Sequence, residues 1–331
     1  MHPTDQILVV GAGPLGRLTE RSLRDRSKRR AVFAHLRFVG EPVDARLATP
    51  VLGTVQDLED VLNKYPVDEV YFAPGSPSDA IDTQQGVATC ERLGVQFALP
   101  ACGGYRLARA VVADHAAVAD GYFHYLSVKK KPLQRALKRL LDVVVSATAL
   151  VVLAPLLVVA ALAVKLSSSG PVLFGQERVG MRGRPFRMLK FRSMVANAED
   201  LQAGLLASNE RTGPVFKLQR DPRVTRVGRF LRKYSIDELP QLLNVLRGEM
   251  SLVGPRPALA QEVARYAAWQ RRRLSVRPGL TCVWQVSGRN AVSFGSWMVL
   301  DMRYIDHWSL ADDLRLILRT VPVVLSGRGA S

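Results

Sequence analysis

An uncharged apolar stretch of 22 residues, Val143–Val164, constrains the fold of this chain more than any other feature. About 20 apolar residues in a helix cross a bilayer core of about 30 Å, so the stretch implicates a membrane. Pro155 interrupts it, because proline inside a helix removes a hydrogen bond and clashes with the carbonyl four residues back. At about 1.5 Å per residue, the parts before and from Pro155 reach about 18 Å and about 15 Å, and neither alone crosses the core.

Both flanks of the stretch are basic. The positive residues are Lys129, Lys130, Lys131, Arg135, Lys138 and Arg139 before it, and Lys165, Arg178, Arg182, Arg184 and Arg187 after it. Positive residues favour the cytoplasmic side of a membrane, so we expect both ends there. We therefore predict a re-entrant helix over 143–164 that breaks at Pro155, enters one leaflet and returns. A straight or kinked span and a buried core helix remain alternatives.

The first 125 residues alternate between strand-like and helix-like patterns. After the apolar run that ends at Val10, further apolar runs lie at 32–39, 67–73 and 94–99, and helical patterns lie at 55–65 and 79–93. This alternation predicts an α/β fold in which residues 1–125 form a Rossmann-like, doubly wound domain. Residues 126–142 are expected to form a basic linker and interfacial helix, and 165–331 a mostly helical α/β domain with amphipathic helices around 258–273 and 310–325.

A glycine fingerprint follows the first strand. Gly11, Gly13 and Gly16 fit the GxGxxG pattern of dinucleotide-binding turns. Such a site needs an acidic residue after the second strand, and Glu41, 25 positions beyond Gly16, is the nearest candidate. One interpretation is a nucleotide site, and the other, which we favour, is a turn that the glycines serve structurally.

The charge balance predicts an anionic partner. The 331 residues, enough for about two domains, include 46 Lys and Arg against 29 Asp and Glu, a net charge of +17. Nucleic acid, an anionic membrane surface or phosphorylated substrates would each be attracted. The three cysteines, Cys90, Cys102 and Cys282, are too widely spaced to predict a disulfide framework or a zinc site. The start of the chain has no secretory signal pattern, so we expect membrane attachment through the internal stretch.

The acidic pair Asp237–Glu238 is unusual in so basic a neighbourhood. It could belong to a capping box, with Ser235 as the N-cap and Glu238 at the third helical position, in the helix that Gly248 ends. If the helix instead begins near the pair, its positive end favours ionised carboxylates, which in a cationic site act as a metal ligand or a nucleophile.

Cations suited to phosphate surround the pair in sequence. They are Lys190, Arg192, Arg223, Arg226, Arg229 and Arg256, the last held between two prolines. Guanidinium groups bind phosphate oxygens bidentately. The pattern predicts chemistry on a phosphate at a membrane surface, and the alternative is a solvated basic face with the carboxylates as counterions.

Five segments carry a resemblance to a known family. They are "KRLLDVVVS", "GPVLFGQERVGMRGRPFRMLKFRSM", "DPRVTRVGRFLRKYSIDELPQLLNVLRGEMSLVGPRP", "RPGLTCVWQVSGRN" and "SGRGA", in order from about residue 130 to 330. They resemble the bacterial sugar transferase family, the monotopic polyprenyl-phosphate phosphoglycosyl transferases. The resemblance implies transfer of a sugar 1-phosphate from a UDP-sugar to undecaprenyl phosphate with release of UMP, which initiates exopolysaccharide, capsule or O-antigen synthesis. Which donor sugar is used stays open.

The resemblance also implies residue roles. Asp237 would attack the β-phosphate and form a covalent phosphosugar intermediate, with Glu238 positioning or deprotonating a reactant and Mg²⁺ held partly by Asp237. Lys190, Arg192 and Arg256 would contact substrate phosphates. Further site candidates are Arg223, Gln241, Gln285, Arg289 and Asn290.

The same resemblance implies a place and partners. It makes 165–331 the catalytic domain, facing the cytoplasm from the bacterial inner membrane, and it matches the predicted re-entrant helix, although Ala154 stands where many members have serine. We expect the lipid bilayer as a partner, allow a homodimer, and expect no nucleic acid. Two rival classes are an NAD-dependent oxidoreductase built on the glycine fingerprint and a non-catalytic membrane scaffold or nucleic-acid binder.

Overall fold

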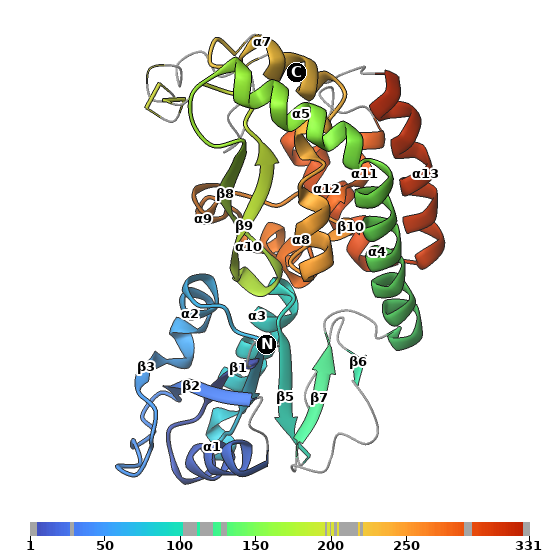
Figure 1. Ribbon diagram of the computed structural model, residues 1–331. Helices are drawn as coiled ribbons and strands as arrows, with labels where there is room; N and C mark the ends of the chain where they lie inside the picture. Colours follow the sequence, from blue (N-terminus) through green and yellow to red (C-terminus); the bar gives the residue numbers. More distant parts are fainter. Residues whose placement is uncertain are drawn as a thin grey trace. The chain divides into compact units, whose positions relative to one another are not determined.

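The computed structural model describes residues 5–26, 30–101, 111–112, 122–126, 131–195, 197–198, 200–201, 204, 218, 221–287 and 293–326. The chain divides into two compact units (Figure 1). Unit 1 contains residues 1–130 with 182–184 and 267–275, and unit 2 contains the remainder. Each unit is described by itself.

Unit 1 is built on a mostly parallel sheet of order β3-β2-β1-β4-β5-β7-β6. Strands β1 to β5 run parallel to one another, and β7 pairs antiparallel with both β5 and β6. The strands are β1 (Asp5–Val10), β2 (Arg30–Arg37), β3 (Val51–Thr54), β4 (Glu69–Phe72), β5 (Gln96–Pro100), β6 (Val111–Val112) and β7 (Tyr122–Leu126). The α/β class predicted from the alternating pattern is confirmed, and the finer Rossmann-like assignment stays a prediction.

Both faces of this sheet are covered, as a parallel sheet requires. Leu8 and Val10 of β1 pack into one apolar cluster, and the alternate residues Ile7 and Val9 pack into another. The helical elements of unit 1 are α1 (Pro14–Arg26), η1 (Val55–Asp57), α2 (Leu58–Lys64), η2 (Pro77–Asp79), α3 (Ala80–Leu93), η4 (Met181–Gly183), α10 (Ala268–Arg271) and η7 (Arg272–Ser275). The helices predicted at 55–65 and 79–93 are confirmed.

Unit 2 combines helices with two small sheets. The strands β8 (Leu173–Val179) and β9 (Pro185–Phe191) form an antiparallel hairpin, and β10 (Ser251–Val253) pairs in parallel with β11 (Gly279–Thr281). The helical elements are α4 (Pro132–Val152), α5 (Ala154–Ser167), α7 (Arg226–Lys233), η6 (Ile236–Glu238), α8 (Gln241–Arg247), α9 (Ala260–Ala264), α11 (Val283–Val286), α12 (Phe294–His307) and α13 (Leu310–Ser326). The helix predicted at 310–325 is confirmed as α13.

The apolar stretch forms two helices, α4 and α5, bent by 64° (Figure 1). Leu153 is the junction, and Pro155 lies in the first turn of α5, where its missing N–H leaves no hydrogen bond unmade. Among the described helices, none by itself has the length and apolarity to cross a membrane, whereas this bent pair meets that test jointly. The break beside Pro155 is therefore present, and the re-entrant path through a leaflet stays a prediction.

One predicted helix is wrong. The amphipathic pattern at 258–273 is divided into α9, α10 and η7, with extended backbone at Ala267. The local sequence contains neither glycine nor proline there, so helix propensity does not explain the break. The side chain of Tyr266, just before the break, is buried, and its ring lies 6.1 Å from that of Phe294. We attribute the break to this tertiary packing.

Candidate functional site

The acidic pair lies in a single turn of 3-10 helix, η6, ahead of α8. Ser235 precedes it with φ of +54°, a left-handed conformation uncommon outside glycine, and its side chain makes no capping bond. The capping-box interpretation is therefore wrong. Helix α8 begins only at Gln241, after Pro240, and it ends at Gly248, whose φ of +81° suits glycine.

Glu238 is the anionic centre of an ion-pair network. Its Oε1 accepts a hydrogen bond of 2.8 Å from Nζ of Lys190, on β9, and lies 3.4 Å from Nη2 of Arg256, which follows β10. Burial opposes ionisation of Glu238, but the charges of Lys190 and Arg256 outweigh it and hold its pKa at about 2. Glu238 is therefore a carboxylate at neutral pH.

Asp237 faces the same cations but is not bonded to them. Its side chain is 6% exposed, and no hydrogen bond or ion pair engages its carboxylate within the described part of the chain. Burial, together with the neighbouring charge of Glu238, raises the pKa of Asp237, and Lys190, Arg232 and Arg256 only partly offset that rise. The carboxylate is thus held near cations without being neutralised by them, as a nucleophile or metal ligand requires.

Two further arginines lie beside this network, and the sequence analysis did not predict them as site residues. Arg232, on α7, donates through Nε to the Ser193 hydroxyl at 2.9 Å. Among the nearby carboxylates, Asp237 does most to favour the charged form of Arg232. Burial lowers the pKa of Arg232. The helical period of the sequence could have predicted this place for Arg232. Gly228 and Leu231 are buried on the inward face of α7, and Arg232, four residues after Gly228, lies on the same face.

Arg178, on β8, is the second. Its Nη1 donates to the carbonyl of Pro257 at 3.1 Å, and its Nε and Nη2 donate to Oε1 of Gln176. Burial, with the nearby charge of Arg256, lowers its pKa to about 10. Arg178 thereby fixes the backbone directly after Arg256. A single arginine in a β-strand gives no sequence signal for such a role.

The other predicted phosphate ligands have different partners. Arg192 donates to the carbonyls of Pro171, Val164 and Ser168, at and beyond the end of α5. Arg223 forms a bidentate pair with Asp221 and donates to the carbonyl of Ala198. Both guanidinium groups thus hold the chain through these bonds, and their contact with substrate phosphate stays a prediction.

The remaining site candidates are Gln241 and Gln285, which the structure describes, and Arg289 and Asn290, which it does not. Gln241 is buried at the start of α8, and its Nε2 has no hydrogen-bond partner among the described residues. Gln285, on α11, accepts a bond of 3.0 Å from the Cys282 thiol. Arg289 and Asn290 lie outside the described residues.

In unit 1, the glycine fingerprint forms a tight turn whose amides are already bonded. The Glu41 carboxylate accepts from the backbone N–H groups of Ala12 at 2.9 Å, Gly13 at 2.8 Å and Phe38 at 3.0 Å. A side chain on Gly11 or Gly16 would meet a backbone oxygen, of Ala73 at 2.4 Å or of Gly11 at 2.1 Å. These contacts favour the interpretation in which the glycines serve the turn, because Glu41 takes the amides that a pyrophosphate would need.

The acidic pair offers part of a ligand set for the predicted magnesium ion. In the described ranges, no group of three or more His, Cys, Asp or Glu side chains is arranged to hold a metal. Mg²⁺, however, is usually bound by one or two carboxylates plus substrate phosphates. The unbonded carboxylate of Asp237 is a hard oxygen donor of that kind, so the residues fit this mode of binding.

Lysine and arginine side chains bind phosphate oxygens, so a carboxylate pair among them suits the class of proteins that act on phosphorylated ligands. Comparison with known proteins narrows this class. The model of the family described as bacterial sugar transferase matches residues 133–327. Since that match covers more than half of the chain, the protein belongs to the bacterial sugar transferase family.

Named relatives agree with this assignment. The chain is similar to the galactosyl transferase CpsE of Streptococcus agalactiae, with 52% identity over 49% of this chain and 36% of the relative. It is similar to the exopolysaccharide production protein ExoY of Sinorhizobium fredii, with 43% identity over 60% of this chain and 90% of ExoY. It is also similar to the UDP-glucose:undecaprenyl-phosphate glucose-1-phosphate transferase of Caulobacter vibrioides, with 49% identity over 57% of this chain and 70% of that protein. The chain thus spans about a third of the length of CpsE and most of ExoY.

Proposed function

We propose that this protein is a phosphoglycosyl transferase, which moves a sugar 1-phosphate from a UDP-sugar to undecaprenyl phosphate and releases UMP. The observation that carries the proposal is the buried, unbonded carboxylate of Asp237 beside the group formed by Glu238, Lys190 and Arg256. The names of the relatives support it, because they refer to undecaprenyl phosphate as acceptor or to galactose or glucose as the sugar.

The reaction we propose has two displacements at one phosphorus atom. An oxygen of Asp237 attacks the β-phosphorus of the UDP-sugar, an Asp–O–P bond forms, and the bond from phosphorus to the bridging oxygen breaks with its electron pair leaving on UMP. A phosphate oxygen of the lipid then attacks the same phosphorus and expels the Asp237 carboxylate. The products are polyprenyl diphospho-sugar, UMP and the regenerated enzyme, and no net proton transfer is needed.

The cations of the site supply electrostatic stabilisation in this scheme. Charge builds up on the equatorial oxygens of the transferring phosphoryl group, and preorganised cations in a dry site stabilise it. Lys190 and Arg256 are held by Glu238, so we assign Glu238 the role of orienting them. Mg²⁺ would be held by Asp237 together with the donor phosphates and, when bound, would offset charge on the diphosphate.

We place the reaction at a membrane surface, on the cytoplasmic face of the bacterial inner membrane. Large exposed apolar side chains gather on the bent helix pair and on α13, among them Val151, Leu166 and Leu318 at 75%, 87% and 72% exposure. Exposed apolar area on this scale is typical of a protein or membrane contact. A re-entrant α4–α5 pair would bring the lipid phosphate to the depth of the catalytic unit. A homodimer stays a prediction.

The first experiment is UMP release from UDP-glucose, UDP-galactose and UDP-N-acetylated sugars, with detergent-solubilised full chain, undecaprenyl phosphate and Mg²⁺. We expect release with at least one donor, and a loss on the order of 10³-fold or more in Asp237→Asn, as for removal of other nucleophiles. The matched control is Asp60→Asn, an exposed carboxylate in another acidic doublet. Full activity in Asp237→Asn would refute the assigned nucleophile.

The covalent step has its own test. With donor but no lipid acceptor, the wild-type protein should release about one equivalent of UMP and gain the mass of a sugar phosphate on the peptide that contains Asp237. Labelling of another residue, or turnover that requires donor and lipid together in a ternary complex, would exclude the two-step route.

A further inference from the structure

Three polar residues of α4 bind the backbone of the two segments that carry the acidic pair and its arginine. Lys138, Arg139 and Asp142 lie within little more than one turn, where a Lys and an Asp four residues apart commonly pair with each other. None of the three pairs within α4. Each instead reaches another element of unit 2.

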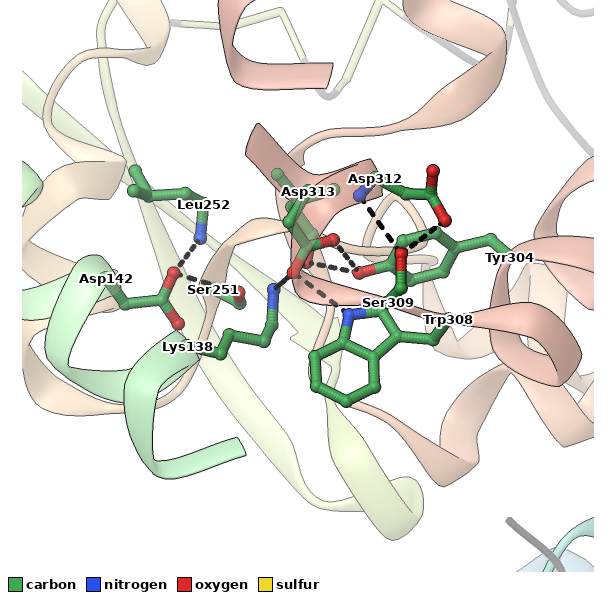
Figure 2. Close-up of polar contacts among 10 residues, drawn as sticks. Lys138, Asp142, Ser251, Leu252, Tyr304, Trp308, Ser309, Asp312 and Asp313 are labelled. Atoms are coloured by element: carbon green, nitrogen blue, oxygen red, sulfur yellow. Dashed lines mark hydrogen bonds and ion pairs between the residues drawn. The ribbon is translucent and has the colours of Figure 1, made fainter. Parts of the chain in front are cut away.

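Asp142 binds strand β10. Its side chain is 2% exposed, and its Oδ1 accepts from the Leu252 amide at 2.9 Å and from the Ser251 hydroxyl at 3.1 Å (Figure 2). Residues 251 and 253 pair with β11, so the amide between them points away from that strand. Asp142 thus satisfies an edge N–H that would otherwise be buried without a partner.

Lys138 binds the end of the same strand. Its Nζ donates to the Val253 carbonyl at 3.0 Å and to Oδ2 of Asp313 at 2.6 Å. Asp313, on α13, also accepts from the Tyr304 hydroxyl and the Trp308 indole N–H (Figure 2). Burial and the charge of Asp313 raise the pKa of Tyr304 well above its usual value, so the hydroxyl stays protonated as a donor. Two residues after Val253 the chain enters Pro255-Arg256-Pro257.

Arg139 binds the other segment. Its Nη1 and Nη2 donate to the carbonyls of Val245 and Leu246 at 2.6 and 2.8 Å, in the last turn of α8. Carbonyls there have no helical partner, and a cation also suits the negative end of the helix. Arg139 thus fixes α8, the helix that only two residues separate from Glu238.

We propose that Arg139 and Asp142 are positioning residues that hold Glu238 and Arg256 in register from one rigid helix. The 3.4 Å contact between Glu238 and Arg256 joins two segments that are 18 positions apart, and both are anchored to α4. The helix that leads into the bent apolar pair therefore also sets the geometry of the site. For its kinetic consequence this inference rests on the proposed phosphoglycosyl transfer.

The test compares Asp142→Ala with Asp142→Asn in the full chain. Alanine removes the acceptor for both bonds, and asparagine keeps one oxygen for the Leu252 amide. We expect Asp142→Ala to lower kcat on the order of 10²-fold, as small misplacements of reacting groups do, with a much smaller change in the donor KM. Asp142→Asn should restore most of kcat. Lys165→Met, which removes an exposed, unbonded charge on α5, is the control for lost charge.

Hydrogen exchange tests the same inference without activity. Amides at 251–257 should exchange faster in Asp142→Ala, and those at 241–247 faster in Arg139→Gln, while the β8–β9 hairpin stays as in the wild type. This result would stand even if the wild-type protein turned over no donor, an outcome that would count against the proposed function alone. Exchange that is unchanged, or raised evenly through unit 2, would overturn the inference, and so would equal kcat losses in Asp142→Ala, Asp142→Asn and Lys165→Met.

A milder variant covers the case in which Asp142→Ala fails to fold. Ser251→Ala removes one of the two donors to Asp142 and leaves the Leu252 bond in place. We expect a smaller loss of kcat and faster exchange limited to 251–257. Wild-type kcat and exchange in Ser251→Ala, together with a kcat loss in Asp142→Asn, would contradict the positioning role.

Discussion

Asp237 and Glu238 are adjacent in sequence, but their carboxyl groups have opposite electrostatic balances. Glu238 is bonded to Lys190 and Arg256, and its pKa falls to about 2. Asp237 is buried without a bonded partner in the part of the chain that the structure describes, and its pKa rises. The ionised form of Glu238 therefore stabilises the folded state, and the ionised form of Asp237 destabilises it. Such a loss of stability is the usual cost of a preorganised reactive group.

These shifts predict opposite effects of two neutral substitutions on stability. The lowered pKa of Glu238, from 4.5 to about 2, corresponds to at most about 3 kcal/mol of stability that is present above pH 4.5 and lost as the pH falls towards 2. Glu238→Gln should lower the free energy of unfolding at pH 7, and its difference from the wild type should shrink below pH 4.5. Asp237→Asn should raise the melting temperature at pH 7, because the raised pKa makes the ionised form destabilising. Denaturant titrations and melting curves from pH 3 to pH 7 measure both effects, and a lower melting temperature for Asp237→Asn would contradict them.

Glu41 gives a second prediction at this scale. Its carboxylate bonds the amides of Ala12 and Gly13, so we expect no detectable NADH or UDP-sugar binding to the glycine turn in the wild type. Glu41→Ala leaves those amides unpaired and should cost about 1–3 kcal/mol of unfolding free energy. Nucleotide titration by fluorescence and thermal melting provide the measurements. Tight NADH binding by the wild type would instead support the oxidoreductase alternative.

At the scale of elements, the bent helix pair connects the apolar stretch to the site. The two helices of the pair pack against different apolar clusters. Val145 and Ala149 of α4 contact the cluster of α8 and β10, and Ala160 and Val164 of α5 contact Phe191 and Leu231. The α4 limb is thus packed against α8, which follows the acidic pair, and the α5 limb against β9 and α7, which carry Lys190 and Arg232. The junction at Leu153 lets each limb make its own contacts.

Replacing Pro155 tests the cause of the bend. Pro155→Ala restores a backbone N–H and removes the clash that keeps residues before proline out of the helical region. If the pair enters one leaflet and returns, a cysteine placed at Ser168 in a chain whose own three cysteines are replaced should be labelled from the cytoplasmic side when Pro155 is present. A fraction should move to the opposite side in Pro155→Ala. Labelling from the periplasmic side when Pro155 is present would show that the pair crosses the membrane.

At the scale of the whole molecule, the charge of +17 has a direct consequence. The full chain should bind vesicles that contain phosphatidylglycerol more tightly than neutral phosphatidylcholine vesicles, and raising the salt from 0.05 to 0.5 M should weaken the difference, since the screening length falls from about 14 Å to about 4 Å. The binding that remains at high salt would measure the contribution of the apolar helices. Vesicle co-sedimentation measures both terms, and equal binding to the two vesicle types at low salt would exclude an electrostatic contribution.

The local sequence determined much of this protein. Periodicity gave the strands near β1, β2, β4 and β5 and the helices α2, α3 and α13, because burial on alternate residues or on one helical stripe leaves its mark in the residue order. The 22-residue uncharged stretch and Pro155 predicted the break, and the order of the basic and acidic motifs pointed to the family that the comparison confirms.

Other features were decided by the tertiary structure. Arg192, predicted to contact substrate phosphates, binds backbone carbonyls, and Arg223, a further site candidate, pairs with Asp221. Arg178 and Arg232, by contrast, lie close to Arg256 and Asp237. One guanidinium resembles another in sequence, and only the path of the chain decides which anion or carbonyl each one meets. The same reason explains why Glu41 lies on the glycine turn and why α4 binds both α8 and β10: contacts between residues far apart in the chain depend on packing, which residue spacing does not record.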